Sequence, residues 1–146
     1  MEIRDAIASD AKSISKLIHE VSVQCNFSEM EPCPQWFIES IKPDVLQRLI
    51  VSDDYLWLIA VEKSEVTGVL TVFESNLVKY LFVHPKFQRK GVAKALWQRV
   101  TPMLRSEISV RSSLFAVPYY EKLGFKKVGE VKFFNGVSFQ TMMAQH

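Results

Sequence analysis

The sequence predicts a single domain of mixed α/β class, in which helices pack on a mixed, mostly antiparallel sheet. Stretches with the period of a strand and stretches with the period of a helix follow one another along all 146 residues, in the order β, α, α, β, β, β, α, β, α, β, β. Apolar residues make up 48% of the chain, which is enough for a core. No linker or internal repeat divides it, so we expect one domain over residues 1–146.

The first third of the chain is expected to hold one strand and the first helices. Residues 1–6 alternate between polar and apolar and predict a short strand, and Ser9 is then expected to cap a helix that runs to residue 25. The segment 26–35 contains two prolines and predicts a loop. Residues 35–50 predict either one helix interrupted at Pro43 or two short helices, for a total of about four helices.

The middle of the chain changes to the period of strands. Residues 55–62 and 65–74 are rich in β-branched and aromatic residues, and a short polar turn between them predicts a hairpin. Residues 76–83 predict a third strand, which the dipeptide His84-Pro85 ends, because the residue before a proline is held extended.

The last third returns to the helical period and then ends in strands. A helix is expected from Val92 and should end or kink at Pro102, followed by a strand over residues 107–113. A short helix is expected to close at Gly124 in a left-handed turn, and a hairpin should turn at Asn135-Gly136.

Composition excludes several classes of protein. The 18 basic and 16 acidic residues give a net charge of +2, which argues against a nucleic-acid-binding protein. The longest apolar run, residues 55–61, is about a third of a membrane span, and the N-terminus lacks the pattern of a signal peptide, so we expect a cytoplasmic protein with no membrane contact. Cys25 and Cys33 are expected to be reduced thiols, and no pattern predicts a metal site.

Gly91 lies between a basic loop and the start of a helix. The first backbone N–H groups of a helix have no internal partner and attract anions, and a phosphate reaches them only where no side chain is in the way. Gly91 and Ala93 leave that space, and Arg89, Lys90 and Lys94 add positive charge around it. The stretch predicts a phosphate-binding loop; an ordinary turn glycine among solvated lysines is the alternative.

Two motifs together resemble the GNAT family of N-acetyltransferases. The family pattern [Gln/Arg]-x-x-Gly-x-[Gly/Ala] is matched by residues 88–93, and the pattern Tyr-Glu-x-x-Gly-Phe is matched by residues 120–125. The predicted order of elements is similar to that of the family over essentially the whole chain. The resemblance implies a GNAT-like fold, in which the fourth and fifth strands splay apart.

The resemblance also implies a donor, acetyl-coenzyme A, and the residues that bind it. Its pyrophosphate is expected on the loop and helix start, and its pantetheine arm beside the end of the fourth strand. The cofactor-binding residues implied are Leu81, Phe82, Val83, Gln88, Arg89, Lys90, Gly91, Val92, Ala93 and Lys94. Relatives often place an asparagine where Arg111 or Ser112 stands, and Ser112 or Ser113 is the possible replacement.

Acetyl transfer to an amine requires a neutral amine, a donor for the oxyanion and a proton or hydrogen bond for the leaving thiolate. A backbone N–H near Val83 is the expected oxyanion donor, and Tyr120 is the candidate catalytic acid, with a core tyrosine as the alternative. No glutamate lies on the fourth strand, where relatives often have the base. Glu29, Glu31, Glu74 and His84 all remain open for that role.

The expected function is therefore direct, metal-independent acetyl transfer from acetyl-CoA to a primary amine of a small molecule or a protein. Glu29 and Glu31, beside Phe27, Trp36 and Phe37, suit either a cationic acceptor or an ordinary surface loop. A non-catalytic acyl-CoA-binding module and a phosphate- or nucleic-acid-binding domain are the alternatives. The aromatic residues of the closing hairpin suggest a possible homodimer.

Overall fold

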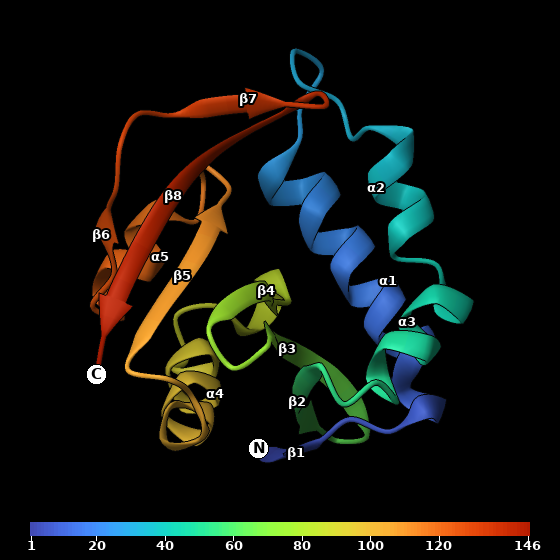
Figure 1. Cartoon of the computed structure of the whole chain (residues 1–146). Coiled ribbons are helices and arrows are strands. Elements are labelled where there is room, and N and C mark those ends of the chain that lie inside the picture. The colour runs from blue at the N-terminus through green and yellow to red at the C-terminus, as the bar shows by residue number, and fades with distance from the viewer.

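The computed structural model describes residues 1–146, whose eight strands form one mixed sheet in the order β1-β2-β3-β4-β5-β8-β6, with β7 paired to β8 (Figure 1). The strands are β1 (Glu2–Asp5), β2 (Tyr55–Glu62), β3 (Glu65–Phe73), β4 (Leu77–Val83), β5 (Glu107–Ser112), β6 (Lys126–Lys127), β7 (Lys132–Phe134) and β8 (Val137–Gln145). Only β4 and β5 pair in parallel, and all other neighbours are antiparallel. The predicted mixed, mostly antiparallel sheet is confirmed.

Five α-helices cover the two faces of this sheet (Figure 1). They are α1 (Ala11–Val21), α2 (Gln35–Ser40), α3 (Pro43–Ile50), α4 (Val92–Val100) and α5 (Val117–Lys122). The helices α1 to α3 enclose one core, in which Ile14, Leu46 and Ile59 are fully buried. The other core lies beneath α4 and α5 and centres on Leu58, Leu96 and Ile108. None of the helices has the length and apolar character needed to cross a bilayer.

Of the two alternatives predicted for residues 35–50, the structure has the two short helices, which makes five helices rather than about four. Pro43 is the first residue of α3, where the missing N–H costs nothing and the fixed φ suits a helix start. Pro102 likewise ends α4, and a 3₁₀ turn over Thr101–Met103 follows, as expected.

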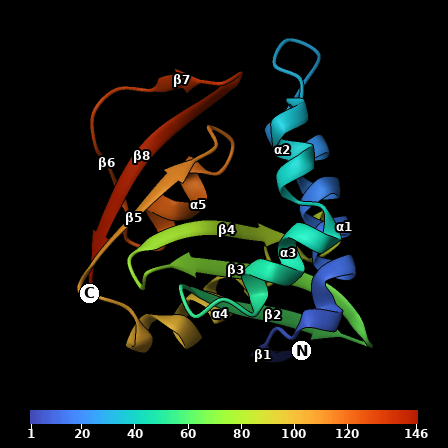
Figure 2. The same ribbon diagram turned by 45° about the vertical axis from the view of Figure 1, so that its right-hand side comes forward.

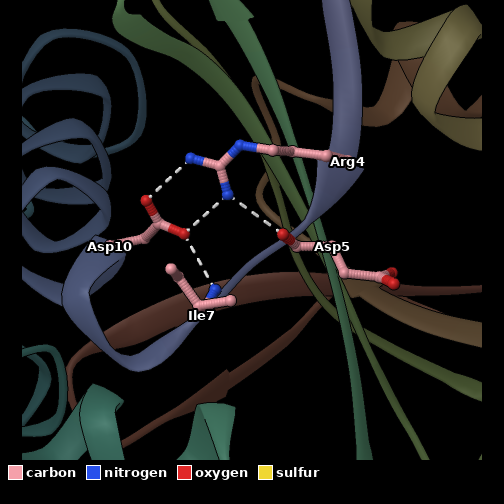
Figure 3. Close-up of polar contacts among 4 residues, drawn as sticks. All are labelled: Arg4, Asp5, Ile7 and Asp10. Atoms are coloured by element: carbon pink, nitrogen blue, oxygen red, sulfur yellow. Dashed lines mark hydrogen bonds and ion pairs between the residues drawn. The ribbon is translucent and has the colours of Figure 1, made fainter.

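The start of α1 differs from the prediction, because Asp10 and not Ser9 lies at its N-cap. Figure 3 shows why: both Asp10 carboxylate oxygens accept hydrogen bonds from Arg4, at 2.9 and 3.0 Å, and Oδ2 also accepts from the Ile7 N–H at 2.8 Å. The Arg4 hydrogen bonds hold the pKa of Asp10 below its usual range. Asp10 thus joins β1 to the first helix.

The hairpin turns form as predicted, with two-residue loops in the left-handed region. Lys63 and Ser64 join β2 to β3 with φ of 49° and 66°, and Asn135 and Gly136 join β7 to β8 with φ of 50° and 82°. Such turns match the twist of the strands that they connect. Cys25 and Cys33 are unpaired and partly buried.

Candidate active site

The strands β4 and β5 separate from each other (Figure 2), and a cleft opens between them. The two strands pair only at Leu77 with Ser109 and at Val78 with Val110, whereas β4 continues to Val83 and β5 to Ser112 without further pairing. The cleft has a volume of about 1400 Å³ and is lined mainly by hydrophobic residues. The expected splay between the fourth and fifth strands is therefore present.

A β-bulge at Lys79 decides which backbone groups of β4 face the cleft. Tyr80 pairs with Thr71 but Val78 pairs with Val72, so β4 holds one extra residue between the two pairs. The N–H of His84 bonds to the Thr67 carbonyl of β3 at 2.8 Å. Since peptide groups alternate along a strand, those of Leu81 and Val83 point away from β3 and into the opening.

The start of α4 forms a cradle of free donors beside the cleft. Gly91 has a left-handed φ of 82° at the N-cap, and a Cβ built there would have no atom within 4 Å. The N–H groups of Gly91, Val92, Ala93 and Lys94 have no backbone acceptor within the chain. An anion that enters this space therefore meets several unpaired donors and the positive end of the helix dipole.

The helix can approach the sheet closely because β3 has a glycine beneath it. A Cβ at Gly68 would lie 2.9 Å from Cγ1 of Val92, which is closer than packing allows. Val92 and Leu96 rest on this gap and fix the first turn of α4 against β3. The position of the cradle thus depends on a residue that does not itself line the cleft.

The expected cofactor-binding residues all line the cleft, except Lys90. They are Leu81, Phe82, Val83, Gln88, Arg89, Gly91, Val92, Ala93 and Lys94. The Lys90 Nζ instead lies 5.6 Å from the centre of the Phe87 ring. The Gln88 side chain is already in use, because its Nε2 donates to the Val83 carbonyl at 3.0 Å, so it supports the end of β4.

Tyr120 lies on α5, where its side chain belongs to the core and also lines the cleft. It is only 6% exposed, and its ring packs edge-on against Phe125 at 5.3 Å between centroids. Burial raises the pKa of the Tyr120 hydroxyl above its usual range. Its neighbour Tyr119 donates to Gln88 Oε1 at 3.5 Å. Tyr120 makes no hydrogen bond through its hydroxyl within the chain, so that group is free for a ligand.

The family comparison agrees with this geometry. The family described as "Acetyltransferase (GNAT) domain" matches residues 17–145, which include the sheet from β2 onward and the whole cleft. The chain belongs to the GNAT acetyltransferase family. The chain is also 33% identical over 72 residues to the uncharacterised N-acetyltransferase YafP of Escherichia coli (strain K12), a match that covers 48% of this chain and 45% of YafP.

Solved structures share the GNAT fold along the whole chain. The PaiA N-acetyltransferase of Thermoplasma acidophilum, in complex with coenzyme A, aligns with a TM-score of 0.80 and 21% identity over 99% of this chain and 98% of its own. A ribosomal-protein-alanine N-acetyltransferase of Brucella melitensis aligns over 100% of both chains, with a TM-score of 0.72 and 13% identity. An aminoglycoside 6'-N-acetyltransferase complexed with coenzyme A aligns with a TM-score of 0.71 and 14% identity, over 99% of this chain and 97% of its own.

The candidate bases are mostly outside this GNAT cleft. His84 faces Glu20 at 3.3 Å, and its Nδ1 accepts from the Lys86 N–H. Glu29 and Glu74 do not line the cleft. Glu31 does, but its Oε1 accepts the backbone N–H of Ser138 at 2.7 Å.

Ser112 and Ser113, the possible replacements for the asparagine of relatives, also line the cleft, yet both hydroxyls are used locally. The Ser112 hydroxyl donates to the Ser113 carbonyl, and the Ser113 hydroxyl accepts from the Ala116 N–H. These two bonds shape the turn that leads from β5 into α5. The expected replacement of the asparagine contact stays a prediction.

Two hydrogen bonds across the mouth of the cleft were missed by sequence reasoning. Ser138 donates its N–H to Glu31, and the Trp36 indole donates to the Asn135 carbonyl at 2.6 Å, so the loop before α2 and the first turn of α2 contact the tip of the β7–β8 hairpin. Figure 1 shows the tip of this hairpin beside the segment that joins α1 to α2. About a hundred residues separate the partners, and no local pattern links them.

Proposed function

We propose that this protein is an acetyl-CoA-dependent N-acetyltransferase that moves the acetyl group directly to a primary amine. The single observation that supports this most is the cradle of unpaired N–H groups at the start of α4, placed beside the opening between β4 and β5. A phosphate-containing donor at this cradle has room to extend its arm along β4. The domain over residues 1–146 is proposed to carry the whole activity.

The donor is held by the chain in two ways. Backbone N–H groups of Gly91 to Lys94 bind the pyrophosphate, with Arg89 and Lys94 adding charge near it. The pantetheine arm then lies beside β4, where the peptide group of Leu81 has no strand partner and can pair with its amides, whereas the Val83 carbonyl already accepts from Gln88.

The chemistry follows from the same groups. The nitrogen of a neutral amine attacks the thioester carbonyl carbon, and the C–N bond forms as the C–S bond breaks. The Val83 N–H donates to the oxyanion, and the Tyr120 hydroxyl donates to the departing thiolate, while the amine gives its proton to water. Because Glu31 is the only carboxylate among the cleft-lining residues, the pKa of the acceptor amine should largely decide how much of it is reactive.

An assay of thiol release from acetyl-CoA over a panel of amines tests this proposal. We expect release that depends on the amine and yields the N-acetyl product by mass spectrometry. Binding of acetyl-CoA without release for any amine would favour a non-catalytic acyl-CoA-binding module instead. The exposed Phe133 and Phe134 of the closing hairpin keep a homodimer as a prediction, which sedimentation analysis checks.

A further inference from the structure

We propose that the acceptor of this cleft is a primary amine that also carries an anionic group, and that Lys79 and Arg111 bind this group. The inference rests on the proposed acetyl transfer and names the class of its acceptor. It replaces the alternative of a purely cationic acceptor, which Glu29 and Glu31 had left open.

Lys79 and Arg111 project from β4 and β5 on the face of the sheet that α1 to α3 occupy. The Lys79 Nζ lies 5.2 Å from the ring centre of Tyr55 and 5.6 Å from that of Tyr80, and both rings pack with the core of α1 to α3. Val110 on β5 faces the opposite core, so Arg111, the next residue, points the other way. Both side chains line the cleft.

Neither cation has an acidic partner within the chain. The ion pairs of the structure join Met1 to Glu62, Arg4 to Asp10, Lys42 to Glu39 and His84 to Glu20, and none includes Lys79 or Arg111. The one acidic side chain in the cleft, Glu31, already accepts a backbone hydrogen bond. Both cationic side chains are exposed in the open cleft, and partial burial of Lys79 lowers the pKa of its ammonium group. An anion bound here would offset that unfavourable environment.

The donor does not require these charges. The phosphate cradle lies at the start of α4, which packs on the opposite face of the sheet from α1 to α3, and it has Arg89 and Lys94 beside it. Lys79 and Arg111 therefore remain as unpaired charge on the acceptor side of the opening. Two positive charges there repel a polyamine and attract an amine with a carboxylate or a phosphate.

The walls around these cations are aromatic, which suggests the rest of the acceptor. Phe27, Phe37, Tyr55, Phe73, Tyr80 and Phe139 line the same cleft. Tyr55 and Phe73 pack together at 5.0 Å, and Phe27 packs on Phe37 at 5.6 Å. Such walls bury an apolar or aromatic group next to the anion. An amino acid with an aromatic side chain has all three features, and phenylalanine and its analogues are suitable probes.

The test compares probes that differ only in charge, by calorimetry on the CoA-saturated full-length protein. We expect N-acetylphenylalanine to bind about tenfold or more tightly than N-phenethylacetamide, which lacks the carboxylate, as a charge-assisted contact predicts. The phosphonic acid analogue of phenylalanine, acetylated in the same way, tells which anion fits better. Lys79→Met and Arg111→Met should each remove most of the preference and leave CoA affinity unchanged.

Lys126→Met is the matched control, because this exposed lysine on β6 lies outside the cleft, and it should keep the full preference. Equal binding of the charged and neutral probes, failure of both to bind at millimolar concentration, or an unchanged preference in both cleft variants would overturn the assignment. The same titration without CoA separates this result from the donor: a protein that prefers the anion but does not bind CoA contradicts the proposed transferase and not the anion site.

Discussion

Tyr120 and Tyr119 are neighbours in α5 but have different hydroxyl environments, which makes them a matched pair. Tyr120→Phe keeps the ring that packs on Phe125 and removes only the free hydroxyl at the cleft. If this hydroxyl assists the departing thiolate, kcat should fall about 10²-fold or more, a range typical of acid–base catalysis. The affinity for acetyl-CoA should hold within a few-fold. Steady-state kinetics and calorimetry measure the two effects.

Tyr119→Phe is the control, since the Tyr119 hydroxyl makes only a long contact to Gln88, and it should stay active. The raised pKa of Tyr120 keeps it protonated up to and beyond pH 10, so its ionisation should not cause a fall in rate below that pH. Full turnover of Tyr120→Phe at saturating acetyl-CoA would show that the residue is structural, with a stability change of about 1 kcal/mol at most.

Asp10 offers a test of stability that is independent of the cleft. Asp10→Asn loses the paired contact with Arg4 and should lower the free energy of unfolding at pH 7 by about 1 kcal/mol. The loss is no larger because Arg4 is partly exposed and solvent weakens the ion pair. The folded-state pKa of Asp10 is lowered, so this stabilisation is present above the unfolded pKa of about 3.9 and is lost as the pH falls further.

Denaturant titrations at several pH values check this, and the deficit of the variant should shrink at pH 3 and below. Asp5→Asn makes the same chemical change at a residue whose backbone carbonyl, rather than its carboxylate, contacts Arg4 (Figure 3). It should leave stability nearly unchanged. A deficit of Asp10→Asn that is constant from pH 2 to pH 7 would contradict the role given to the ion pair.

The start of α4 is the element on which the donor site depends. Gly91→Glu places a carboxylate in the open space before the unpaired N–H groups, and its bulk and charge should weaken CoA binding at least tenfold. The left-handed φ of 82° adds strain of about 1–2 kcal/mol for a side chain at this position. Calorimetry with CoA and thermal unfolding measure the two contributions separately.

Gly91→Asn is the matched control, because asparagine tolerates the left-handed conformation and carries no charge. It should lose less CoA affinity than Gly91→Glu. If both variants bind CoA as the parent does, the cradle is not the phosphate site and the donor must lie elsewhere in the cleft.

Most elements were predictable because their ends have local signals. The residues at the two-residue turns, the proline at the start of α3 and the glycine after α5 each fix a backbone conformation by themselves. At the end of α5, Phe125 and Gly124 donate to the Tyr120 and Glu121 carbonyls, and Phe125 packs on Tyr120, as the Tyr-Glu-x-x-Gly-Phe pattern predicts. The Ser9 cap was wrong because Ser9 lies within a 3₁₀ turn over Ala8–Asp10, which precedes α1 and in which Arg4 holds Asp10.

The bulge at Lys79 has no local signal in the sequence. Apolar side chains follow one another from Tyr80 to Val83 because both faces of β4 are covered by a core. In the structure, Val78, Leu81 and Val83 join one core while Tyr80 and Phe82 face the other. The run therefore predicts a strand that is buried on both faces, but not the change of register at Lys79.

For the molecule as a whole, the donor should stabilise the fold, because it binds the folded chain and not the unfolded one. Acetyl-CoA at about 100 times its dissociation constant adds about 2.7 kcal/mol to the free energy of unfolding. This should raise the melting temperature by roughly 5 °C or more for a chain of this size. Free CoA should act nearly as strongly, since it keeps the phosphates. No shift with either ligand at millimolar concentration would contradict the donor assignment.

The overall arrangement was predictable from the order of elements, whereas the closure of the cleft was not. Glu31 and Ser138 lie 107 positions apart and Trp36 and Asn135 lie 99 positions apart, so the fold brings each pair together from distant parts of the sequence. Lys79 and Arg111 likewise come from two different strands, β4 and β5. Contacts of this kind depend on tertiary structure, and sequence patterns of a few residues do not contain them.

The opening between β4 and β5 passes from one face of the sheet to the other. The phosphate cradle lies on the face of α4, and the unpaired cations lie on the face of α1 to α3. If the donor binds at the cradle and the acceptor at the cations, as proposed, the two enter the cleft from opposite faces, and each product leaves by the face from which its precursor came. Because β4 and β5 pair at one end only, the sheet itself contains a passage in which two reactants from opposite faces can come into contact.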